Sequence, residues 1–366
     1  MNRIITAITC AIVVLGLGNQ RSLASEDPSP GETSDIVITA VGDIAFPTES
    51  YKSRINRLNT RIFDPTRAIL KRGDLVFGNI EAPLTTAPTV EQKTYAFTMP
   101  PERLGWLLDA GFNLFSLANN HTADAGEAGI RDTIEHLTKA EKSHGIHWSG
   151  TTLDPKTEYT PTIFTVKGTK IGFLAVGNNR SSFVYRMRPS RITQAIRALD
   201  KDVDVVILSI HYGKEYRHVP HKSTVAIYRN FVDAGADLIL GHHPHVIRGI
   251  EQYKQALIVH SLGNYTFASK TVRHRKTGAK LYGAIAEIRI SNKRVDQATI
   301  HPLYVNNLEP WTLGEETIPS ANFVPFPVKD AFAKAVLSDL QEWSDAIPGN
   351  RIRIRRKGDT GIIRMR

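Results

Sequence analysis

The stretch that decides the fold prediction is Gly241-His242-His243-Pro244-His245, which directly follows the apolar run Leu238-Ile239-Leu240. Such a run is typical of a buried strand, and the glycine ends it just before three imidazoles. Histidine is the commonest nitrogen ligand of protein-bound metals, and side chains two residues apart at a strand end can point into one site. The stretch by itself is also compatible with a solvated, histidine-rich turn.

The same arrangement recurs along the chain. Polar side chains follow other apolar runs at Asp43, at Asn79 with Glu81, at Asn120 with His121, and at His211. Strands that alternate with helices and carry polar residues at their carboxyl ends describe an open α/β sheet, in which ligands bind beside those ends. A hairpin over 162–176 and a later strand pair, 283–290 with 297–305, add antiparallel strands. We therefore predict an α/β fold with a mixed, two-layered sheet core.

The N-terminus predicts export. Met1-Asn2-Arg3 carries one positive charge, an apolar stretch over 4–18 follows, and Ser22-Leu23-Ala24 resembles a signal-peptidase site. We expect residues 1–24 to be a signal peptide, 25–34 a linker, 35–310 the main domain, and 311–366 a C-terminal helix with a basic tail. The apolar stretch is shorter than the about 20 residues of a membrane span, but an uncleaved anchor stays open.

The single cysteine of the 366 residues, Cys10, lies inside the predicted signal peptide. The mature chain would therefore have no thiolate ligand and no disulfide. Any metal would be held by His, Asp, Glu and Asn side chains.

The net charge of +10 raises the possibility of nucleic-acid binding. However, the densest basic run, 351–357, lacks the interleaved aromatic residues of a base-stacking surface, so we expect no nucleic-acid partner. For an exported protein, an anionic membrane surface or a polyanionic envelope polymer fits better. A solvated tail that favours solubility is an equally good interpretation of the run.

Neither a Gly-x-Ser-x-Gly elbow nor a glycine-rich phosphate loop is present. What remains is a set of oxygen and imidazole side chains that suits one or two divalent ions such as Mn, Zn or Fe. Most members have a structural alternative, because Asp43 could be a turn residue and Asn119-Asn120 could cap the following helix. Glu81 is harder to explain that way, because a carboxylate within an apolar stretch needs a partner.

The motifs occur in an order that resembles the CapA family of bacterial capsule and poly-γ-glutamate synthesis proteins, also called PgsA-like. The resemblance covers about 35–269 and rests on Ala40-Val-Gly-Asp43, Gly78-Asn-Ile-Glu81, Leu117-Ala-Asn-Asn-His-Thr-Ala-Asp-Ala-Gly126, His211-Tyr-Gly-Lys-Glu-Tyr216, Gly241-His-His-Pro-His-Val246 and Ser261-Leu-Gly-Asn-Tyr-Thr-Phe267. It implies a calcineurin-like metallophosphoesterase fold, a four-layer α/β/β/α sandwich, and an exported or membrane-anchored protein. It also implies a role in making, exporting or anchoring an anionic poly-γ-glutamate polymer.

The match to metallophosphoesterases is partial. Ala45 stands where those enzymes have a histidine, and Glu81 would replace their bridging aspartate. Asn120 matches their amide ligand and His121 their acid near the leaving group. Glu215 could supply a replacement carboxylate.

These considerations give a complete set of candidate site residues. We assign metal ligation to Asp43, Glu81, Asn120, His211, His243 and His245, catalysis to His121, Glu215 and Asp124, and substrate binding to Asn79, Asn119, Asn264 and His242. The predicted reaction is metal-dependent hydrolysis of a phosphoester or amide bond in envelope polymer biosynthesis. Two alternatives stay open, namely a non-enzymatic factor that binds the polymer or a membrane-bound synthase, and a periplasmic phosphoesterase.

Overall fold

The computed structural model describes residues 35–46, 52–267, 272–305, 308–321 and 323–366. The predicted signal peptide and the predicted linker lie outside the described residues. Within the described part, no helix has both the length and the apolar character needed to cross a bilayer.

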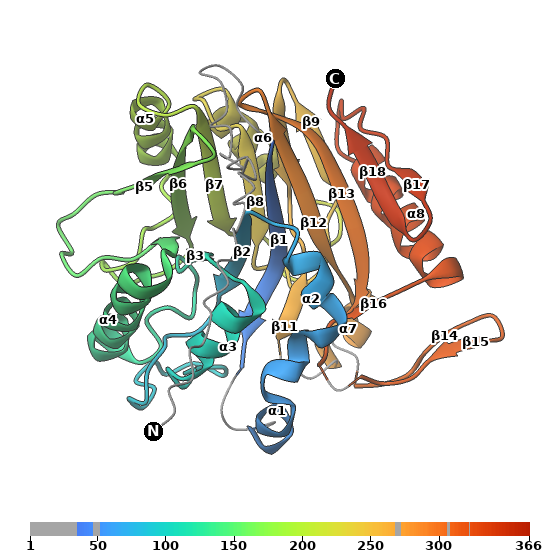
Figure 1. Cartoon of the computed structure of the whole chain (residues 1–366), viewed down its shortest axis with the longest axis horizontal. Helices are drawn as coiled ribbons and strands as arrows, with labels where there is room; N and C mark the ends of the chain where they lie inside the picture. Colours follow the sequence, from blue (N-terminus) through green and yellow to red (C-terminus); the bar gives the residue numbers. More distant parts are fainter. Residues whose placement is uncertain (1–34, 47–51, 268–271, 306–307, 322) are drawn as a thin grey trace, which may run out of the picture. The chain divides into compact units, whose positions relative to one another are not determined.

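The larger sheet has β1 near its centre (Figure 1). Its strand order is β17-β18-β13-β12-β1-β2-β3-β4, and β11 and β16 pair with β1 and β13 respectively. The bounds are β1 Ile36–Ala45, β2 Leu75–Ile80, β3 Leu114–Ser116, β4 His147–Ser149, β11 Asn264–Phe267, β12 Tyr282–Ser291, β13 Arg294–Tyr304, β16 Phe326–Pro327, β17 Arg355–Lys357 and β18 Thr360–Arg364. Strands β1 to β4 are parallel, whereas β12 and β13 run antiparallel, so the sheet is mixed.

The second sheet has the order β5-β6-β7-β8-β10-β9. Its four inner strands are parallel, and both edge strands are antiparallel. The bounds are β5 Thr162–Val166, β6 Thr169–Gly177, β7 Val205–His211, β8 Leu238–His242, β9 Ile250–Tyr253 and β10 Ala256–Val259. A separate hairpin consists of β14 Trp311–Leu313 and β15 Glu316–Ile318.

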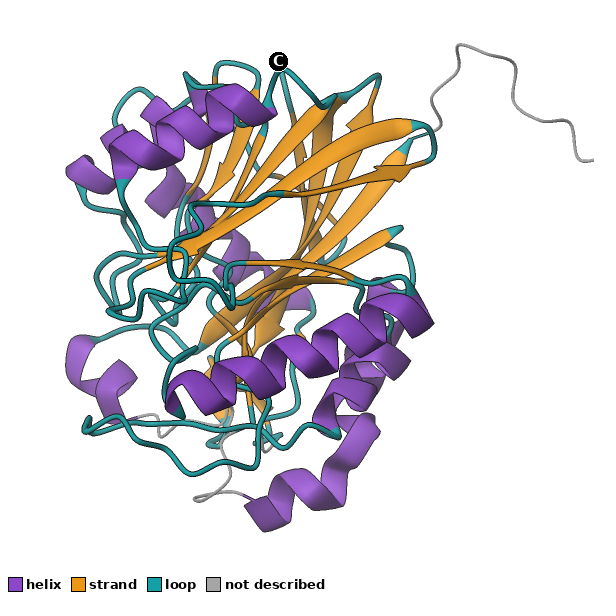
Figure 2. Ribbon diagram, turned by 90° about the vertical axis from the view of Figure 1, so that its left-hand side faces the viewer, coloured by secondary structure: helices purple, strands orange, loops and turns teal. Residues whose placement is uncertain are grey.

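Most helices cover the outer faces of the two sheets, as the turned view shows (Figure 2), and the last helix, over 330–345, packs against β9, β13 and β18 in the core that the two sheets share. Their bounds are α1 Lys52–Leu58, α2 Asp64–Leu70, α3 Arg103–Ala110, α4 Gly126–His144, α5 Pro189–Leu199, α6 Lys222–Val232, α7 Val272–Thr277 and α8 Asp330–Asp345, with a 3-10 turn over Asn59–Phe63.

Three apolar cores establish the layer order. The first joins the facing sides of the two sheets, with Phe77 against Phe173 at its centre. The second joins the larger sheet to the α2 and α3 side, and the third joins the smaller sheet to α5 and α6. Helix, sheet, sheet and helix therefore follow one another, which confirms the predicted four-layer α/β/β/α sandwich with mixed sheets.

Two sequence predictions need correction. Asp43 does not follow its strand but lies within it, because β1 continues through Asp43 to Ala45, with an irregular register at this end. The basic run 351–357 is also not a free tail. Strand β17 pairs with β18, and β18 pairs with β13, so the C-terminal segment is part of the larger sheet.

A close backbone approach places β11 beside the end of β1. The amide of Asp43 donates to the carbonyl of Gly263 at 2.9 Å, and a side-chain carbon on Gly42 would lie 2.0 Å from that carbonyl oxygen. Glycine is thus the residue that fits at position 42. The contact aligns Asn264 with Asp43.

His218 ties three segments together, and its burial predicts acid sensitivity. Its ring stacks on Trp343, its Nδ1 donates to the carbonyl of Ile247 at 2.7 Å, and its Nε2 accepts from the amide of Lys280 at 3.1 Å. Burial lowers the pKa of His218 to about 4. This contribution to stability is therefore present above the unfolded pKa of about 6.5 and is lost as the pH falls toward 4.

The unfolding free energy of the wild type should decrease between pH 7 and pH 5. We expect this decrease to be about 2 kcal/mol smaller in His218→Gln. Urea denaturation of both proteins at each pH measures the difference, with His144→Gln, at an exposed position on α4, as the control. Equal slopes for wild type and His218→Gln would contradict the prediction.

Candidate metal centre

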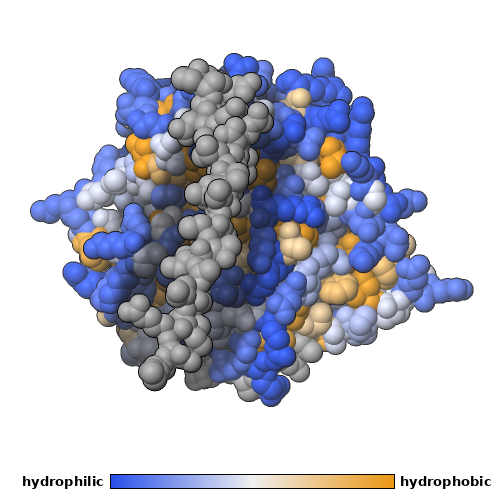
Figure 3. Space-filling view, viewed as in Figure 1, coloured by the Kyte–Doolittle hydropathy of each residue, from blue (hydrophilic) through white to orange (hydrophobic). Residues whose placement is uncertain are grey.

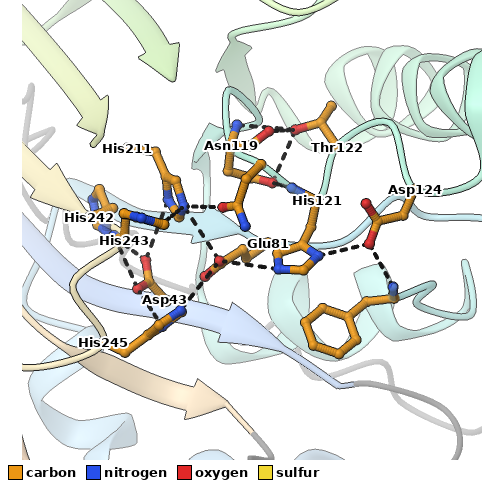
Figure 4. A network of polar contacts seen from close by, with 12 residues as sticks. Asp43, Glu81, Asn119, His121, Thr122, Asp124, His211, His242, His243 and His245 are labelled. Atoms are coloured by element: carbon orange, nitrogen blue, oxygen red, sulfur yellow. Dashed lines mark hydrogen bonds and ion pairs between the residues drawn. The ribbon is translucent and has the colours of Figure 1, made fainter. Parts of the chain in front are cut away.

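Strand register brings the predicted residues together. In the larger sheet Asp43 aligns with Asn79 on β2, and in the smaller sheet His211 on β7 aligns with His242 on β8. The carboxyl ends of these strands meet at one edge of the two sheets, where their side chains converge (Figure 4). Two sequence positions that lie almost 200 residues apart thereby come into contact, since His242 Nδ1 lies 3.1 Å from Asp43 Oδ1.

The turn after β8 has an unusual backbone. His243 and His245 have φ angles of 93° and 58°, a region that non-glycine residues adopt at a cost of about 1–3 kcal/mol each. The amide of Tyr216 donates to the carbonyl of Pro244 at 2.9 Å and holds the turn. The turn directs His245 back to Asp43, with Nδ1 and Oδ2 3.4 Å apart.

Asp43 is fully buried and ionised. Its Oδ1 accepts from Asn79 Nδ2 at 2.9 Å, and its Oδ2 lies 3.4 Å from the amide of His243. Burial alone would raise the pKa of this carboxyl, but hydrogen bonds from His242 and His245 hold its pKa well below the usual value.

Glu81 lies at the centre of the cluster and has no hydrogen-bond partner for either carboxylate oxygen. Its side chain is fully buried, and its Oε1 faces nitrogens of His211, His245 and His121 at 3.4, 3.8 and 3.9 Å. Burial and the charge of Asp43 raise the pKa of Glu81 well above its usual value. A buried carboxylate surrounded by imidazoles at these distances has the surroundings of a metal ligand.

Nitrogen and oxygen donors also crowd around His211. Its Nε2 lies 2.6 Å from Asn120 Oδ1, 3.1 Å from His243 Nδ1 and 3.4 Å from Glu81 Oε1. One ring nitrogen can serve only one proton or one lone pair, so it cannot satisfy three neighbours. A cation between these atoms would satisfy all of them.

An imidazole must be neutral to bind a metal, and of His211, His243 and His245 the first two meet this condition in the metal-free protein. Burial lowers the pKa of His211 well below its usual value, and it lowers that of His243 to about 3, so both rings are neutral. Burial also acts to lower the pKa of His245, but Glu81 and Asp43 raise it to about 10. A cation at Glu81 and Asp43 would displace that proton.

Within the described residues, three overlapping sets of side chains have ligand atoms within 4.8 Å of one another. Glu81 belongs to two of them. The sets are Glu81 with His211 and His243, Asp43 with Glu81 and His245, and Glu215 with His243 and His245. Neutral imidazole and carboxylate donors fit Zn, Mn or Fe. Ala45 is buried beside them and offers no donor, as the sequence indicated.

His121 faces the cluster from the segment after β3. Its Nδ1 donates to Asp124 Oδ2 at 2.7 Å, which leaves Nε2 directed at Glu81. Phe97 packs on the ring with centroids 4.3 Å apart, and Lys93 pairs with Asp124. Asp124 itself is fully buried, so it orients His121 and does not contact a substrate directly.

Glu215 lies at the open side of the cluster. About a third of its side chain is exposed, and it pairs with Arg273 at 3.3 Å. The buried Arg248 donates to the carbonyls of Lys214 and Arg217, which flank Glu215 in the sequence. These hydrogen bonds fix the loop that carries Glu215.

The structure changes the interpretation of the four predicted substrate-binding residues. All four are at most 1% exposed; they are Asn79, Asn119, Asn264 and His242. Asn79 bonds to Asp43, Asn119 donates to the carbonyl of Ile80 at 2.7 Å, and His242 packs on Phe77 behind Asp43. These residues therefore position the cluster. Its accessible side is formed by the half-buried Asn120, His243 and Glu215.

Sequence analysis missed Lys93, Phe97 and Arg248. The first two belong to the segment between β2 and α3. They do not follow an apolar run, which was the signal that located the other site residues. Arg248 follows the histidine turn by three residues, and only its burial distinguishes it from the many other basic residues of this chain.

The fold and the cluster together define a protein of the metallophosphatase-like class. A family model described as "Bacterial capsule synthesis protein PGA_cap" matches residues 37–269, and the chain belongs to this family.

Two relatives from Bacillus agree with this membership. The chain is 30% identical over 315 residues to the PGA biosynthesis protein CapA of Bacillus subtilis, with 82% of each chain covered. It is 29% identical over 294 residues to the capsule biosynthesis protein CapA of Bacillus anthracis, covering 76% of this chain and 71% of that one. Among solved structures, a phosphatase from Mycoplasma pneumoniae aligns with a TM-score of 0.46 and 16% identity, covering 74% of this chain and 94% of that one.

Proposed function

We propose that this protein acts in the synthesis of a capsule or of poly-γ-glutamate, an anionic envelope polymer, as an exported, metal-dependent hydrolase. The observation that carries the catalytic part of the proposal is Glu81, because its two buried oxygens have no hydrogen-bond partner and face three imidazoles. The names of the CapA relatives supply the polymer context.

One or two divalent ions would be held by the predicted ligand set, which is Asp43, Glu81, Asn120, His211, His243 and His245, with Glu215 at the open side. When bound, such an ion supplies Lewis acidity and lowers the pKa of water. His121 supports hydrolysis as the acid near the leaving group, while Asp124 fixes its orientation. Because Nδ1 donates its proton to Asp124, Nε2 takes up a proton from the attacking water before it gives one to the leaving group. The bond cleaved would be an amide of the polymer or a phosphoester.

Export is part of the proposal and rests on the composition of residues 1–24. A membrane-bound synthase is the partner that an exported polymer-processing protein would contact. An uncleaved N-terminal segment would hold the protein at the membrane, and cleavage would release it.

A non-enzymatic role is the second candidate. It is favoured by Ala45, since the buried position that would complete the first metal shell carries no donor. In that case the fold would bind the polymer or its synthase without hydrolysing either.

The test is the metal content of the purified protein and of a His243→Ala/His245→Ala variant after exposure to Mn or Zn at neutral pH. We expect about one or two bound ions per wild-type chain and near-complete loss in the variant, because two neutral nitrogen ligands disappear. A His144→Ala/His136→Ala variant on α4 is the matched control. Wild-type protein without bound metal would overturn the hydrolase proposal.

A further inference from the structure

A basic cavity lies beside the metal cluster. It has a volume of about 160 Å³ and is lined by four cationic side chains, which are Lys156, Arg186, Arg188 and Arg191. One carboxylate, Glu158, also lines it, and this residue pairs with Arg191. Among the described residues, no ion pair neutralises the other three cations.

The walls of this cavity are anchored to the fold. The hydroxyl of Tyr159 donates to the carbonyl of Arg186 at 2.5 Å and joins the two loops that form the cavity. The ring of Tyr159 also packs edge-on against Tyr185, with centroids 5.8 Å apart. The loop before β5 projects at the left of Figure 1, and its tip is hydrophilic in Figure 3. The cations are therefore presented by a fixed frame.

Strand pairing places the cavity next to the metal cluster. Gly177 ends β6 and pairs with His211 on one side. On its other side Gly177 forms an isolated β-bridge with Arg186. Earlier along β6, this side of the strand pairs with β5. Two strand spacings amount to roughly 10 Å, so the backbones of Arg186 and His211 lie about that far apart.

A second loop contact supports the same proximity. The side chain of Asn179 donates to the carbonyl of Asn119 at 2.8 Å, just before Asn120 and His121. The segment between β6 and α5 therefore touches the candidate site at one end and carries Arg186 and Arg188 at the other.

A neighbouring cavity has the opposite character. It has a volume of about 310 Å³ and shares Tyr185 with the basic cavity, but its one charged lining residue is Glu141. Positive charge is therefore concentrated in one of the two cavities that share Tyr185.

We propose that this basic cavity is a subsite for a carboxylate of an anionic polymer, and that it holds the chain while a neighbouring unit occupies the metal centre. The inference rests on the proposed function, and it places one carboxylate of the polymer substrate in the basic cavity. Guanidinium groups pair with carboxylates through two parallel hydrogen bonds, which suits a polymer with one carboxylate per unit.

The experiment measures the binding of a fluorescein-labelled, γ-linked glutamate decamer to the purified protein by fluorescence anisotropy at low salt. We expect Arg186→Gln/Arg188→Gln to weaken binding about tenfold, since two charge-assisted contacts are lost. The control is Arg197→Gln/Lys201→Gln, which removes two exposed charges near the far end of α5 and should change affinity less than about twofold.

Three results would overturn the subsite. They are no binding of the decamer by the wild type, equal weakening in both double variants, and tighter binding of a polyphosphate of matched charge. Metal content, measured on the same samples, separates this inference from the proposed function. Arg186→Gln/Arg188→Gln should keep the wild-type metal content while it binds the decamer more weakly, whereas a wild type that binds the decamer but no metal would overturn the proposed function alone.

Discussion

Glu81→Gln is expected to abolish metal binding and to stabilise the metal-free protein. The substitution keeps the shape of the side chain but removes the charge that a cation requires. We expect the affinity for Mn or Zn to fall at least about a hundredfold and the rate of hydrolysis to fall about a thousandfold. In metal-free protein the unfolding free energy should rise by about 1–3 kcal/mol, because burial and the charge of Asp43 disfavour a charge at this position and glutamine carries none.

The opposite signs of these two effects make the test specific. Chemical denaturation after chelation measures the stability gain, and thermal shifts on metal addition measure the lost affinity. Glu135→Gln, at an exposed position on α4, is the matched control and should change neither quantity. Retention of metal by Glu81→Gln would place the site elsewhere, and a loss of metal-free stability would show that Glu81 has a structural partner.

His121→Asn should reduce hydrolysis about 10²–10⁴-fold while metal content stays at the wild-type value. The reason is geometric, since His121 faces Glu81 at 3.9 Å but lies outside the sets of side chains that could hold an ion. Asp124→Asn should have a smaller effect, about tenfold, because it removes the residue that orients the ring and leaves the ring in place.

The two variants are compared with wild type on an aryl phosphate and on a γ-glutamyl anilide, with metal content measured on the same samples. His144→Asn, on the exposed side of α4, is the control. Unchanged hydrolysis by His121→Asn would exclude the acid role. Loss of metal from that variant would instead make His121 a ligand.

The order of elements follows from local patterns. Apolar runs followed by polar residues identified β2, β7 and β8. The identity of most cluster residues also followed from the sequence, because polar side chains at the ends of parallel strands converge at one edge of a sheet. The C-terminal strands escaped prediction, because β17 has three exposed basic residues and no alternation of apolar and polar positions.

Roles within the cluster could not be predicted in the same way. Asn79, Asn119 and His242 have the same chemistry as ligands or substrate contacts, and only their partners in the folded chain distinguish them. Asn79 and His242 face Asp43, and Asn119 donates to the carbonyl of Ile80. The basic cavity was likewise invisible, because Lys156 and Arg186 lie thirty residues apart in loops without a motif.

The sequence by itself determined the two-layered α/β sheet core of this protein and the residues of its candidate site, since hydrophobic periodicity and residue type act locally along the chain. The four-layer arrangement followed from the resemblance to a family. Only the tertiary structure decided which donor atoms meet, which carboxylate has no hydrogen-bond partner, and where positive charge gathers. These properties depend on distances between segments and on exclusion from water, and both arise when the two sheets pack against each other.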